Sequence, residues 1–256
     1  MQKNYLEIKI QDKIAWIKIN REEKLNALNI SMLEEIRKNL IDLGKNKNVL
    51  ALVIIGSGDK AFVAGADIAE FSKYDKNKGL ELAKKGQKNV LDLIENFPKP
   101  IIAAINGYAL GGGLELAMAC HMRVAVNTAK MGLPEVSLGL IPGYGGTQRL
   151  TKLVGKTNAM EMILSGEMID SQKALNLRLV NKVVERNNLF SSITELAKKI
   201  MRNSPNAIAN AITSINAAQK NLEGFEIEKE KFSECFESKD FKEGVSAFLN
   251  KRKPSF

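Results

Sequence analysis

The sequence predicts an α/β protein whose sheet-containing core is followed by a region of helices alone. Apolar and polar residues alternate over 6–10 and again over 15–19, which is typical of a hairpin with one solvent-exposed face. Unbroken apolar runs at 49–55 and 101–105 are typical of strands buried on both faces. From residue 157 onward, the apolar residues recur mostly at helical spacing.

Helices are expected between the predicted strands. Ser31 and Glu34 have the spacing of a capping box, and the apolar stripe that follows ends at Leu43. A second helix is expected over 78–97, because Pro98 disfavours helical backbone in the residue before it. Pro-Glu at 134–135 stands at the expected start of a further helix, since proline suits the first helical position.

The stretch 99–120 is the centre of the predicted organisation. The strand at 101–105 leads into an Asn-Gly turn at 106–107, then into three glycines at 111–113, then into a helix that contains Glu115. A glycine turn at a helix start leaves backbone N–H groups free to point toward a ligand. A glutamate one turn into such a helix lies beside whatever those N–H groups bind.

The composition is that of an ordinary globular protein. Apolar residues make up 45% and charged residues 26% of the 256 residues, which allows one large domain or a core with an appendage. There is no bilayer-spanning apolar run, apolar signal core or Arg-rich transit segment, so a cytoplasmic location without a membrane partner is expected. Cys120 and Cys235 lack zinc-site spacing and are interpreted as small apolar side chains, so no metal is expected.

The formal net charge of +9 admits three explanations. It suits nucleic acid, a polyanionic small molecule or merely a lysine-rich surface. The basic residues are scattered apart from a cluster at 251–253, and an aromatic content of 6% offers few platforms for base stacking. Charge alone therefore does not decide which partner the protein binds.

Two backbone positions and two carboxylates are candidates for catalysis. Ala66 and Gly112 lie at small-residue turns that enter helices, and two N–H groups so placed make an oxyanion hole for a carbonyl that gains negative charge. Glu115 and Glu135 each lie in the first turn of an expected helix. There the helix dipole favours the ionised form, while apolar surroundings and a second carboxylate favour the protonated form. Such opposing effects can keep one acid and one base near neutral pH.

Each of these features also has a simpler structural explanation. The three glycines can serve close packing of a helix against a sheet, and Glu135 can be merely a favourable residue at a helix start. His121, the one histidine, lacks the neighbours of a catalytic dyad. The glycine loop near Tyr144 lacks the context of a dinucleotide site, and no HExxH, GxSxG or P-loop motif occurs. The residue pattern alone therefore indicates an α/β enzyme that stabilises an oxyanion.

Three segments resemble the enoyl-CoA hydratase (crotonase) family. They are AGADI at 64–68, NGYALGGGLEL at 106–116 and LPEVSLGLIPGYGGTQRL at 133–150. The resemblance covers nearly the whole chain, from the N-terminal hairpin to residue 252. Within the family it is greatest to the bacterial short-chain enoyl-CoA hydratases, or 3-hydroxybutyryl-CoA dehydratases, and it implies a hydro-lyase of that kind.

The resemblance also implies a fold and an assembly. It implies a crotonase-like spiral of ββα units over 1–190, which holds the CoA and catalytic sites, and a C-terminal helical oligomerisation region over 191–256. Family members form trimers, usually paired into hexamers, so a homo-oligomer is expected.

The implied activity is reversible syn hydration of a short-chain trans-2-enoyl-CoA, with dehydration of 3-hydroxybutyryl-CoA to crotonyl-CoA as the reverse. By the resemblance, the N–H groups of Ala66 and Gly112 bind the thioester oxygen, and Glu115 and Glu135 flank one water above the 2,3-double bond. The acyl-CoA is the substrate, and no separate cofactor is expected. An enoyl-CoA isomerase and an RNA-binding relative are the alternatives. The presence of both glutamates favours hydration, so no nucleic-acid partner is expected.

The resemblance further implies where the CoA lies. The loop 24–28 and the turn 64–68 cradle it, with Ala27 and Ala64 near the adenine, while two C-terminal residues are expected from a neighbouring subunit. The substrate-binding residues implied in this way are Lys24, Ala27, Leu28, Ala64, Asp67, Ile68, Pro142, Gly143, and, from the neighbour, Phe248 and Lys251.

Two residues depart from the family pattern. Leu133 stands where some hydratases have a glutamine whose amide can steady the first glutamate, so the orientation of Glu115 must come from elsewhere. Met131 replaces a common phenylalanine in the wall of the acyl pocket. Neither change affects the two carboxylates.

Overall fold

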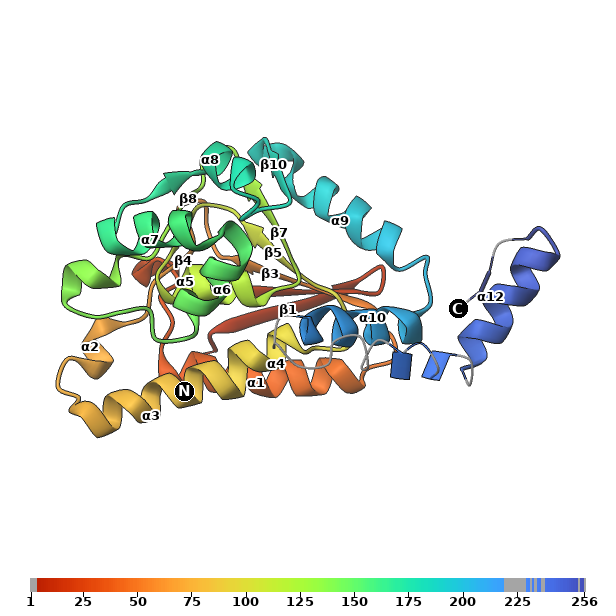
Figure 1. Cartoon of the computed structure of the whole chain (residues 1–256), viewed down its shortest axis with the longest axis horizontal. Coiled ribbons are helices and arrows are strands. Elements are labelled where there is room, and N and C mark those ends of the chain that lie inside the picture. The colour runs from red at the N-terminus through yellow and green to blue at the C-terminus, as the bar shows by residue number, and fades with distance from the viewer. Residues whose placement is uncertain are drawn as a thin grey trace.

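The chain folds into two β-sheets surrounded by helices, which confirms the predicted α/β class (Figure 1). The computed structural model describes residues 4–218, 229–230, 232, 234–235, 238–252 and 254–255. The larger sheet has six strands in the order β1-β2-β3-β5-β7-β10. Its strands are β1 (Leu6–Gln11), β2 (Ile14–Ile19), β3 (Ala51–Gly56), β5 (Ile101–Ile105), β7 (Met122–Val126) and β10 (Lys182–Val184).

The N-terminal hairpin and the two buried strands form as predicted. β1 and β2 pair antiparallel, and Asp12 and Lys13 at their turn both have positive φ angles, of 52° and 63°. A two-residue turn of this hand matches the right-handed twist of paired strands. The remaining strands of the sheet run parallel, and every residue of β3 and β5 is buried.

The smaller sheet, in the order β4-β6-β8-β9, determines which loops meet. Its strands are β4 (Ala61–Ala64), β6 (Tyr108–Leu110), β8 (Lys130–Gly132) and β9 (Ile169–Asp170). β4, β6 and β8 run parallel, with Ala64 opposite Leu110 and Leu110 opposite Gly132. The carboxyl ends of these strands therefore lie at one edge of the sheet, where ligands of parallel sheets commonly bind.

Four strands of three residues or fewer were not predicted from the sequence. β6, β8 and β10 have three residues each, and β9 has two. Segments this short show no alternation of apolar and polar residues, so their pairing depends on the neighbouring strands rather than on their own pattern.

Helices account for most of the rest of the chain. They are α1 (Ile30–Lys45), α2 (Ile68–Phe71), α3 (Lys76–Gly86), α4 (Asp92–Glu95), α5 (Gly112–Ala119), α6 (Gly146–Val154), α7 (Lys156–Ser165), α8 (Ser171–Asn176), α9 (Leu189–Ile200), α10 (Pro205–Ala217) and α12 (Lys239–Leu249). Shorter helical turns are η1 (Glu22–Lys24), η2 (Gln87–Leu91), η3 (Pro134–Leu138) and η4 (Arg186–Asn188).

The capping-box prediction for α1 is wrong, although the apolar stripe of this helix is buried as expected. Asn29 is the N-cap, and its side-chain oxygen accepts the N–H of Met32 at 2.8 Å. Ser31 lies inside the first turn. Asn29 takes the capping role because its extended backbone, with φ −124° and ψ 169°, aims a short side chain at the free N–H.

The helix expected over 78–97 is present but divided. It begins at Lys76, passes through the π-helical turn η2 and ends at Glu95, before Pro98 as predicted. A Cβ on Gly86 would lie 2.3 Å from Cε1 of Tyr144. The ring of Tyr144 therefore packs directly on the backbone of Gly86, where α3 ends and η2 begins.

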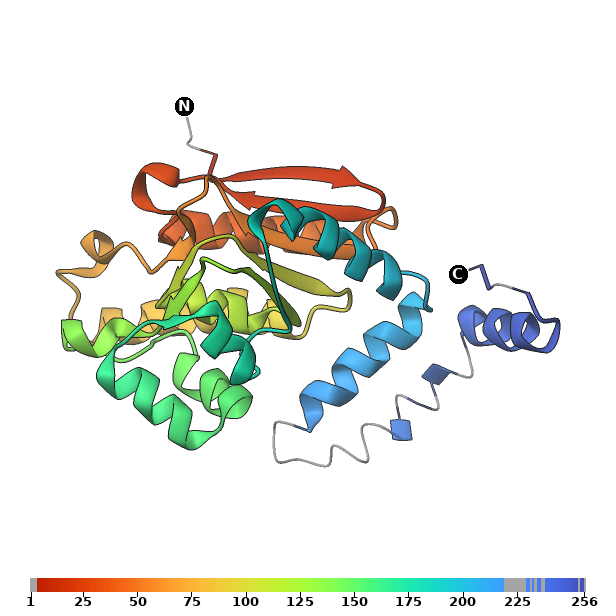
Figure 2. The same cartoon turned by 90° about the horizontal axis from the view of Figure 1, so that it is seen from above.

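The C-terminal helices extend away from the sheets. Figure 2 shows α10 and α12 reaching to one side of the molecule, with α12 at the opposite end from α2 and α3. Within the described residues, no helix has the length and apolar content needed to cross a membrane.

Candidate active site

Gly111 marks the point where three chain segments meet, at the carboxyl ends of β4, β6 and β8. Its φ of 49° and ψ of −127° turn the chain from β6 into α5, a conformation that glycine adopts without strain. Its N–H donates to the carbonyl oxygen of Gly132 at 2.9 Å. A Cβ here would lie 2.9 Å from Oε1 of Glu135 and 3.6 Å from Cα of Gly65. The turns after β4 and β6 and the segment after β8 are therefore in contact.

Ala66 and Gly112 present two backbone N–H groups that make no hydrogen bond within the described part of the chain. Leu28 donates to Gly65 and accepts from Asp67 at 2.9 and 2.7 Å, which leaves the intervening N–H of Ala66 directed away from Leu28. Gly112 is the first residue of α5, where N–H groups lack helical partners. A Cβ on Gly112 would lie 3.7 Å from the Ala66 nitrogen. Both groups can therefore donate to one oxygen between them.

Glu115 lies in the first turn of α5, with 1% of its surface exposed. Its Oε1 accepts the N–H groups of Tyr144 at 2.8 Å and of Gly146 at 2.7 Å. Burial raises the pKa of Glu115 to about 7, against the lowering effect of the Gly146 N–H and with a further increase from the charge of Glu135. The two N–H donors provide the support that Leu133, in place of glutamine, cannot give.

Glu135 lies in η3, which begins with proline as predicted. Its Oε2 is buried and has no hydrogen-bond partner among the described residues. Burial raises the pKa of this carboxyl. Because an unpartnered buried oxygen strongly disfavours the ionised form, burial favours the protonated form of the Glu135 carboxyl.

The groups that position Glu115 were missed by the sequence analysis. The turn 144–146 supplies its two N–H donors, and Arg149 binds the carbonyl oxygen of Tyr144 at 2.8 Å. A signal was available, because Arg149 shares the buried face of α6 with Leu150 and Val154. An arginine within an apolar stripe indicates a buried polar contact.

Comparison with known proteins identifies the family of this chain. A family model described as enoyl-CoA hydratase/isomerase matches residues 9–256. The short-chain-enoyl-CoA hydratase of Clostridium acetobutylicum is 41% identical, over 99% of this chain and 97% of its own. The crotonyl-CoA hydratase of Syntrophomonas wolfei is 42% identical, over 96% and 95% of the two chains. This chain belongs to the enoyl-CoA hydratase/isomerase family.

Solved structures show that the fold is that of the family. A crystal structure of an enoyl-CoA hydratase from Bacillus anthracis superposes with a TM-score of 0.92 at 36% identity, covering 99% of both chains. One from Geobacillus kaustophilus gives 0.93 at 37% identity, covering 100% of this chain and 99% of that one. The expectation of an enzyme with the crotonase fold is confirmed.

The loop 24–28, to which the family resemblance assigns CoA binding, is held in place by Asn26. This residue is fully buried, and its Nδ2 donates to the carbonyl oxygens of Ser57 and Ala61, both at 2.9 Å. Its positive φ of 60° is one that asparagine tolerates better than most residues. The loop is thereby fixed against β4 rather than left to move freely.

Asp67, a predicted CoA contact, is engaged within the protein. Its Oδ2 pairs with Nη2 of Arg21 at 2.6 Å, and its Oδ1 accepts the N–H of Ala69 at the start of α2. The hydrogen bond from Arg21 lowers the pKa of Asp67. This pair joins the loop that follows β2 to the turn that follows β4, so Asp67 shapes the predicted CoA site through Arg21. A direct contact between Asp67 and CoA stays a prediction.

The other predicted CoA contacts differ in burial and position. Leu28 borders the candidate oxyanion hole, since its Cδ1 would lie 3.6 Å from a Cβ on Gly112. The side chain of Phe248 lies outside the described residues. Lys251 follows α12, far from α5 in both views of the molecule. Three of the predicted contacts are buried: Ala27, Leu28 and Pro142. Two are partly buried, Ala64 and Asp67, and four are exposed: Lys24, Ile68, Gly143 and Lys251.

His121 and Cys120 have structural roles. His121 accepts the N–H of Ile101 on Nδ1 at 2.9 Å, and its Nε2 bonds the carbonyl oxygen of Glu95 at 3.1 Å. Burial raises the pKa of the Cys120 thiol to about 12, which makes it unreactive. Among the described residues, no group of three or more His, Cys, Asp or Glu side chains is arranged to hold a metal ion.

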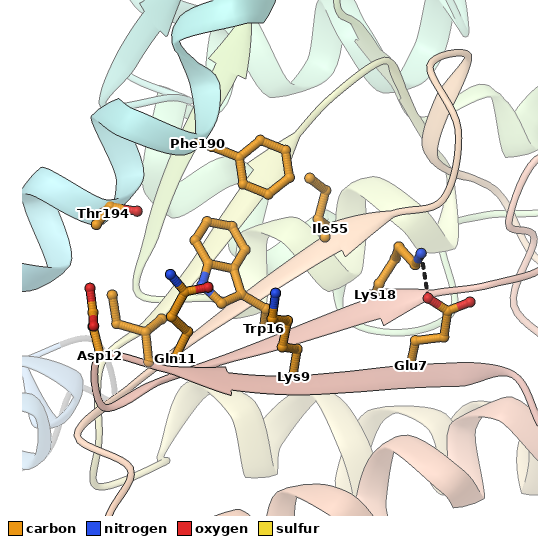
Figure 3. A pocket seen from close by; sticks show the side chains of 10 residues that line it. Glu7, Lys9, Gln11, Asp12, Trp16, Lys18, Ile55, Phe190 and Thr194 are labelled. Atoms are coloured by element: carbon orange, nitrogen blue, oxygen red, sulfur yellow. Dashed lines mark ion pairs between the residues drawn. The ribbon is translucent and has the colours of Figure 1, made fainter.

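A pocket of about 470 Å³ lies elsewhere, between the N-terminal hairpin and the start of α9 (Figure 3). Trp16 stacks on Phe190 with ring centroids 4.9 Å apart, and Lys18 pairs with Glu7. None of the predicted site residues lines this pocket. It is therefore separate from the candidate active site.

Glu115→Gln is expected to flatten the dependence of stability on pH. Because folding raises the pKa of Glu115 from 4.5 to about 7, the folded protein binds this proton more tightly than the unfolded chain does. This tighter binding adds to the free energy of unfolding. The added stability is complete at pH values below 4.5, the pKa of Glu115 in the unfolded chain, and is lost as the pH rises through about 7, its pKa in the folded protein. The shift corresponds to at most about 3 kcal/mol.

Denaturant unfolding at about pH 5 and about pH 8 measures this effect. Wild type should lose more stability than Glu115→Gln between the two values, and exposed Glu195→Gln should behave as wild type does. Equal losses in wild type and Glu115→Gln would contradict the raised pKa.

Proposed function

We propose that this protein catalyses the reversible syn hydration of short-chain trans-2-enoyl-CoA to 3-hydroxyacyl-CoA, which in reverse dehydrates 3-hydroxybutyryl-CoA to crotonyl-CoA. One observation carries the proposal: Glu115 and Glu135 share a site with two backbone N–H groups that make no hydrogen bond in the described part of the chain. The names of the relatives, a short-chain-enoyl-CoA hydratase and a crotonyl-CoA hydratase, support the same class of reaction.

The N–H groups of Ala66 and Gly112 bind the thioester carbonyl oxygen. When a nucleophile adds at C3, negative charge moves onto this oxygen as an enolate, and fixed donors stabilise it without reorganising. Losing one such donor typically costs about 3–4 kcal/mol of transition-state stabilisation. That magnitude suits a reaction whose main barrier is formation of a thioester enolate.

Glu115 is the base and Glu135 the acid in the hydration direction. The oxygen of a water molecule bonds to C3 while Glu115 takes one of its protons, and Glu135 gives its own proton to C2. The proton then passes from Glu115 back to Glu135 through solvent, so the net change is addition of one water. Two N–H donors on Glu115 favour its ionised form, whereas the unpartnered oxygen of Glu135 favours its protonated form.

The net charge of +9 suits a substrate with several phosphate charges. CoA is such a substrate, and the exposed Lys24 and the buried Ala27 and Leu28 lie on the loop proposed to hold it. The reaction needs no cofactor besides the thioester itself, and it involves neither nucleic acid nor membrane.

Residues 1–190 are proposed to hold the catalytic site and 191–256 to assemble the chain into a homotrimer or a dimer of trimers. The extended C-terminal helices support this, because Ile215 and Phe232 are 64% and 66% exposed. Large apolar side chains exposed on one surface are typical of an interface that a second chain covers. Phe248 and Lys251 would then reach a neighbouring active site.

Both glutamates are expected to be required for turnover. Glu115→Gln and Glu135→Gln should each lower kcat for crotonyl-CoA by about 10²–10⁴ with little change in CoA binding, because each removes a proton-transfer group. Loss of absorbance of the conjugated thioester, followed for crotonyl-CoA and for longer enoyl-CoAs, measures hydration and ranks chain length. Exposed Glu195→Gln is the matched control.

Near-normal activity in both variants would overturn the assignment. A shifted double bond without addition of water would indicate the isomerase alternative. Strong, steeply salt-dependent RNA affinity that CoA does not affect, without any hydration, would indicate the RNA-binding alternative.

Two glycine variants are expected to differ in what they lose. Gly112→Ala should lose turnover, and Gly113→Ala should lose stability. A Cβ on Gly112 meets neighbours at ordinary distances, the nearest at 3.6 Å, but it occupies the space beside the Ala66 nitrogen. The variant should fold and lose at least about 100-fold in turnover, since the thioester oxygen is displaced. A Cβ on Gly113 would lie 1.9 Å from the carbonyl oxygen of Val63, so Gly113→Ala should lose about 1–3 kcal/mol of stability.

Turnover and thermal unfolding of the two purified variants test this contrast. A Gly112→Ala variant that is stable and fully active would argue against the oxyanion hole.

Assembly is expected to depend on the exposed apolar residues of the C-terminal helices. Light scattering on the eluting protein should give the mass of three or six chains. Ile215→Glu should shift the mass toward smaller species, because a charge in a covered apolar surface is costly. Leu80→Glu, on exposed α3, should leave the mass unchanged, and a monomeric wild type would contradict the proposed assembly.

A further inference from the structure

The turn 144–146 that binds Glu115 has little rigidity of its own. Gly143 and Gly145 flank Tyr144, and Gly145 has a φ of 94°. Glycines lose more backbone freedom on ordering than other residues do, so a turn built from them holds its N–H groups in place when an outside contact fixes it.

We propose that Arg149 is the positioning residue for the catalytic base, fixing through the turn 144–146 the two N–H groups that hold Glu115. This inference rests on the role of Glu115 in the proposed function. Arg149 itself binds the carbonyl oxygen of Tyr144 and not Glu115, so it acts on the base through the turn.

The contacts of Arg149 support this role. Its Nη1 donates to the carbonyl oxygen of Tyr144 at 2.8 Å, while the N–H of the same tyrosine donates to Glu115. Tyr144 is therefore held on both sides of its Cα. A Cβ on Gly145 would lie 2.5 Å from the same Nη1, which shows that the guanidinium packs directly beneath the turn.

The guanidinium is itself fixed by two carboxylates of α4. Nη2 lies 2.8 Å from Asp92 and 2.7 Å from Glu95, and Nε lies 3.1 Å from Glu95. The arginine side chain is 8% exposed, whereas those of Asp92 and Glu95 are 40% and 27% exposed, so solvent screens the pair with Asp92 more than the pair with Glu95. A lysine has a single nitrogen and no planar fork, so it would not reproduce the separate Nη1, Nη2 and Nε contacts to the carbonyl oxygen and the two carboxylates.

The same arginine also affects the protonation of the base. The groups that face Glu115 are Glu135 from η3, Tyr144 from the turn and Arg149 from α6, while Asp92 and Glu95 face Arg149. Burial raises the pKa of Glu115 to about 7, and the charge of Arg149 opposes that rise. Loss of the arginine is therefore expected to raise this pKa further, both by removing charge and by loosening the two N–H donors.

Arg149→Met, Arg149→Lys and a matched control test the inference. Arg149→Met should lower kcat for crotonyl-CoA by about 10–100-fold with KM changed less than about threefold, because the base is displaced while substrate binding is not. The limb of the rate profile on which activity rises with pH should move to higher pH. In Arg149→Lys the rate should rise at the same pH as in wild type, since the positive charge is kept. Its kcat should still be lower than that of wild type.

Arg123→Met is the control for loss of a buried arginine. Arg123 is also buried, and its guanidinium binds backbone oxygens, of Leu179 at 2.7 Å and of Cys120 at 2.6 Å, away from the turn. It should lose stability but keep the wild-type pH profile. The positioning role would be overturned if Arg149→Met resembled Arg123→Met in two respects: the pH at which the rate rises, and the relative changes in kcat and KM.

Two further measurements keep the test decisive. The carbon-13 carboxyl resonances of labelled glutamate report the pKa of Glu115 without any turnover, and the Glu115→Gln variant identifies which resonance belongs to Glu115. If this pKa is the same in Arg149→Met as in wild type, the inference is overturned. If wild type hydrates no enoyl-CoA, the proposed function fails, and this titration still decides what Arg149 does to Glu115. If Arg149→Met does not fold, Arg149→Gln removes the same charge with a polar side chain and should shift the pH limb in the same direction.

Discussion

The parallel pairing of β4, β6 and β8 is the constraint on which the candidate site depends. Ala64, Leu110 and Gly132 stand opposite one another, so the residues that follow them leave the sheet at one edge. The candidate oxyanion donors, Ala66 and Gly112, follow β4 and β6, and the proposed acid, Glu135, follows β8. A shift of register in any of the three strands would separate the donors from the carboxylates.

Backbone geometry, more than side-chain identity, makes the proposed oxyanion hole. Gly111 enters a conformation that leads the chain from β6 into α5, and Gly112, the first residue of α5, has no side chain of its own beside the Ala66 nitrogen. A Cβ on Gly113 would collide with β4, which explains why the helix can approach the strand so closely. The glycines thus serve close packing, and the proposed mechanism gives them a chemical role as well, so the two explanations are complementary.

The buried carboxyl of Glu115 is held by backbone donors, and one arginine fixes those donors, rather than by a direct ion pair. Glu115 receives two N–H groups from the turn 144–146, while Arg149 binds that turn and two carboxylates of α4. This arrangement leaves Glu115 partly destabilised as an anion, as a base near neutral pH requires. A direct arginine–glutamate pair would instead lower its pKa and weaken it as a base.

The sequence by itself determined the α/β class, the buried strands β3 and β5, and the residue types of an oxyanion-stabilising enzyme, because periodicity and motifs are local properties. The resemblance supplied the family, which the comparisons confirm. The capping of α1 and the strands β6, β8, β9 and β10 were decided by tertiary contacts, since short segments carry no pattern of their own. The support of Glu115 was likewise not predicted, although Arg149 within the apolar stripe of α6 was a signal that a buried polar contact exists. Its donors are backbone groups 29 and 31 residues away, and the parallel sheet and Arg149 bring and hold them there.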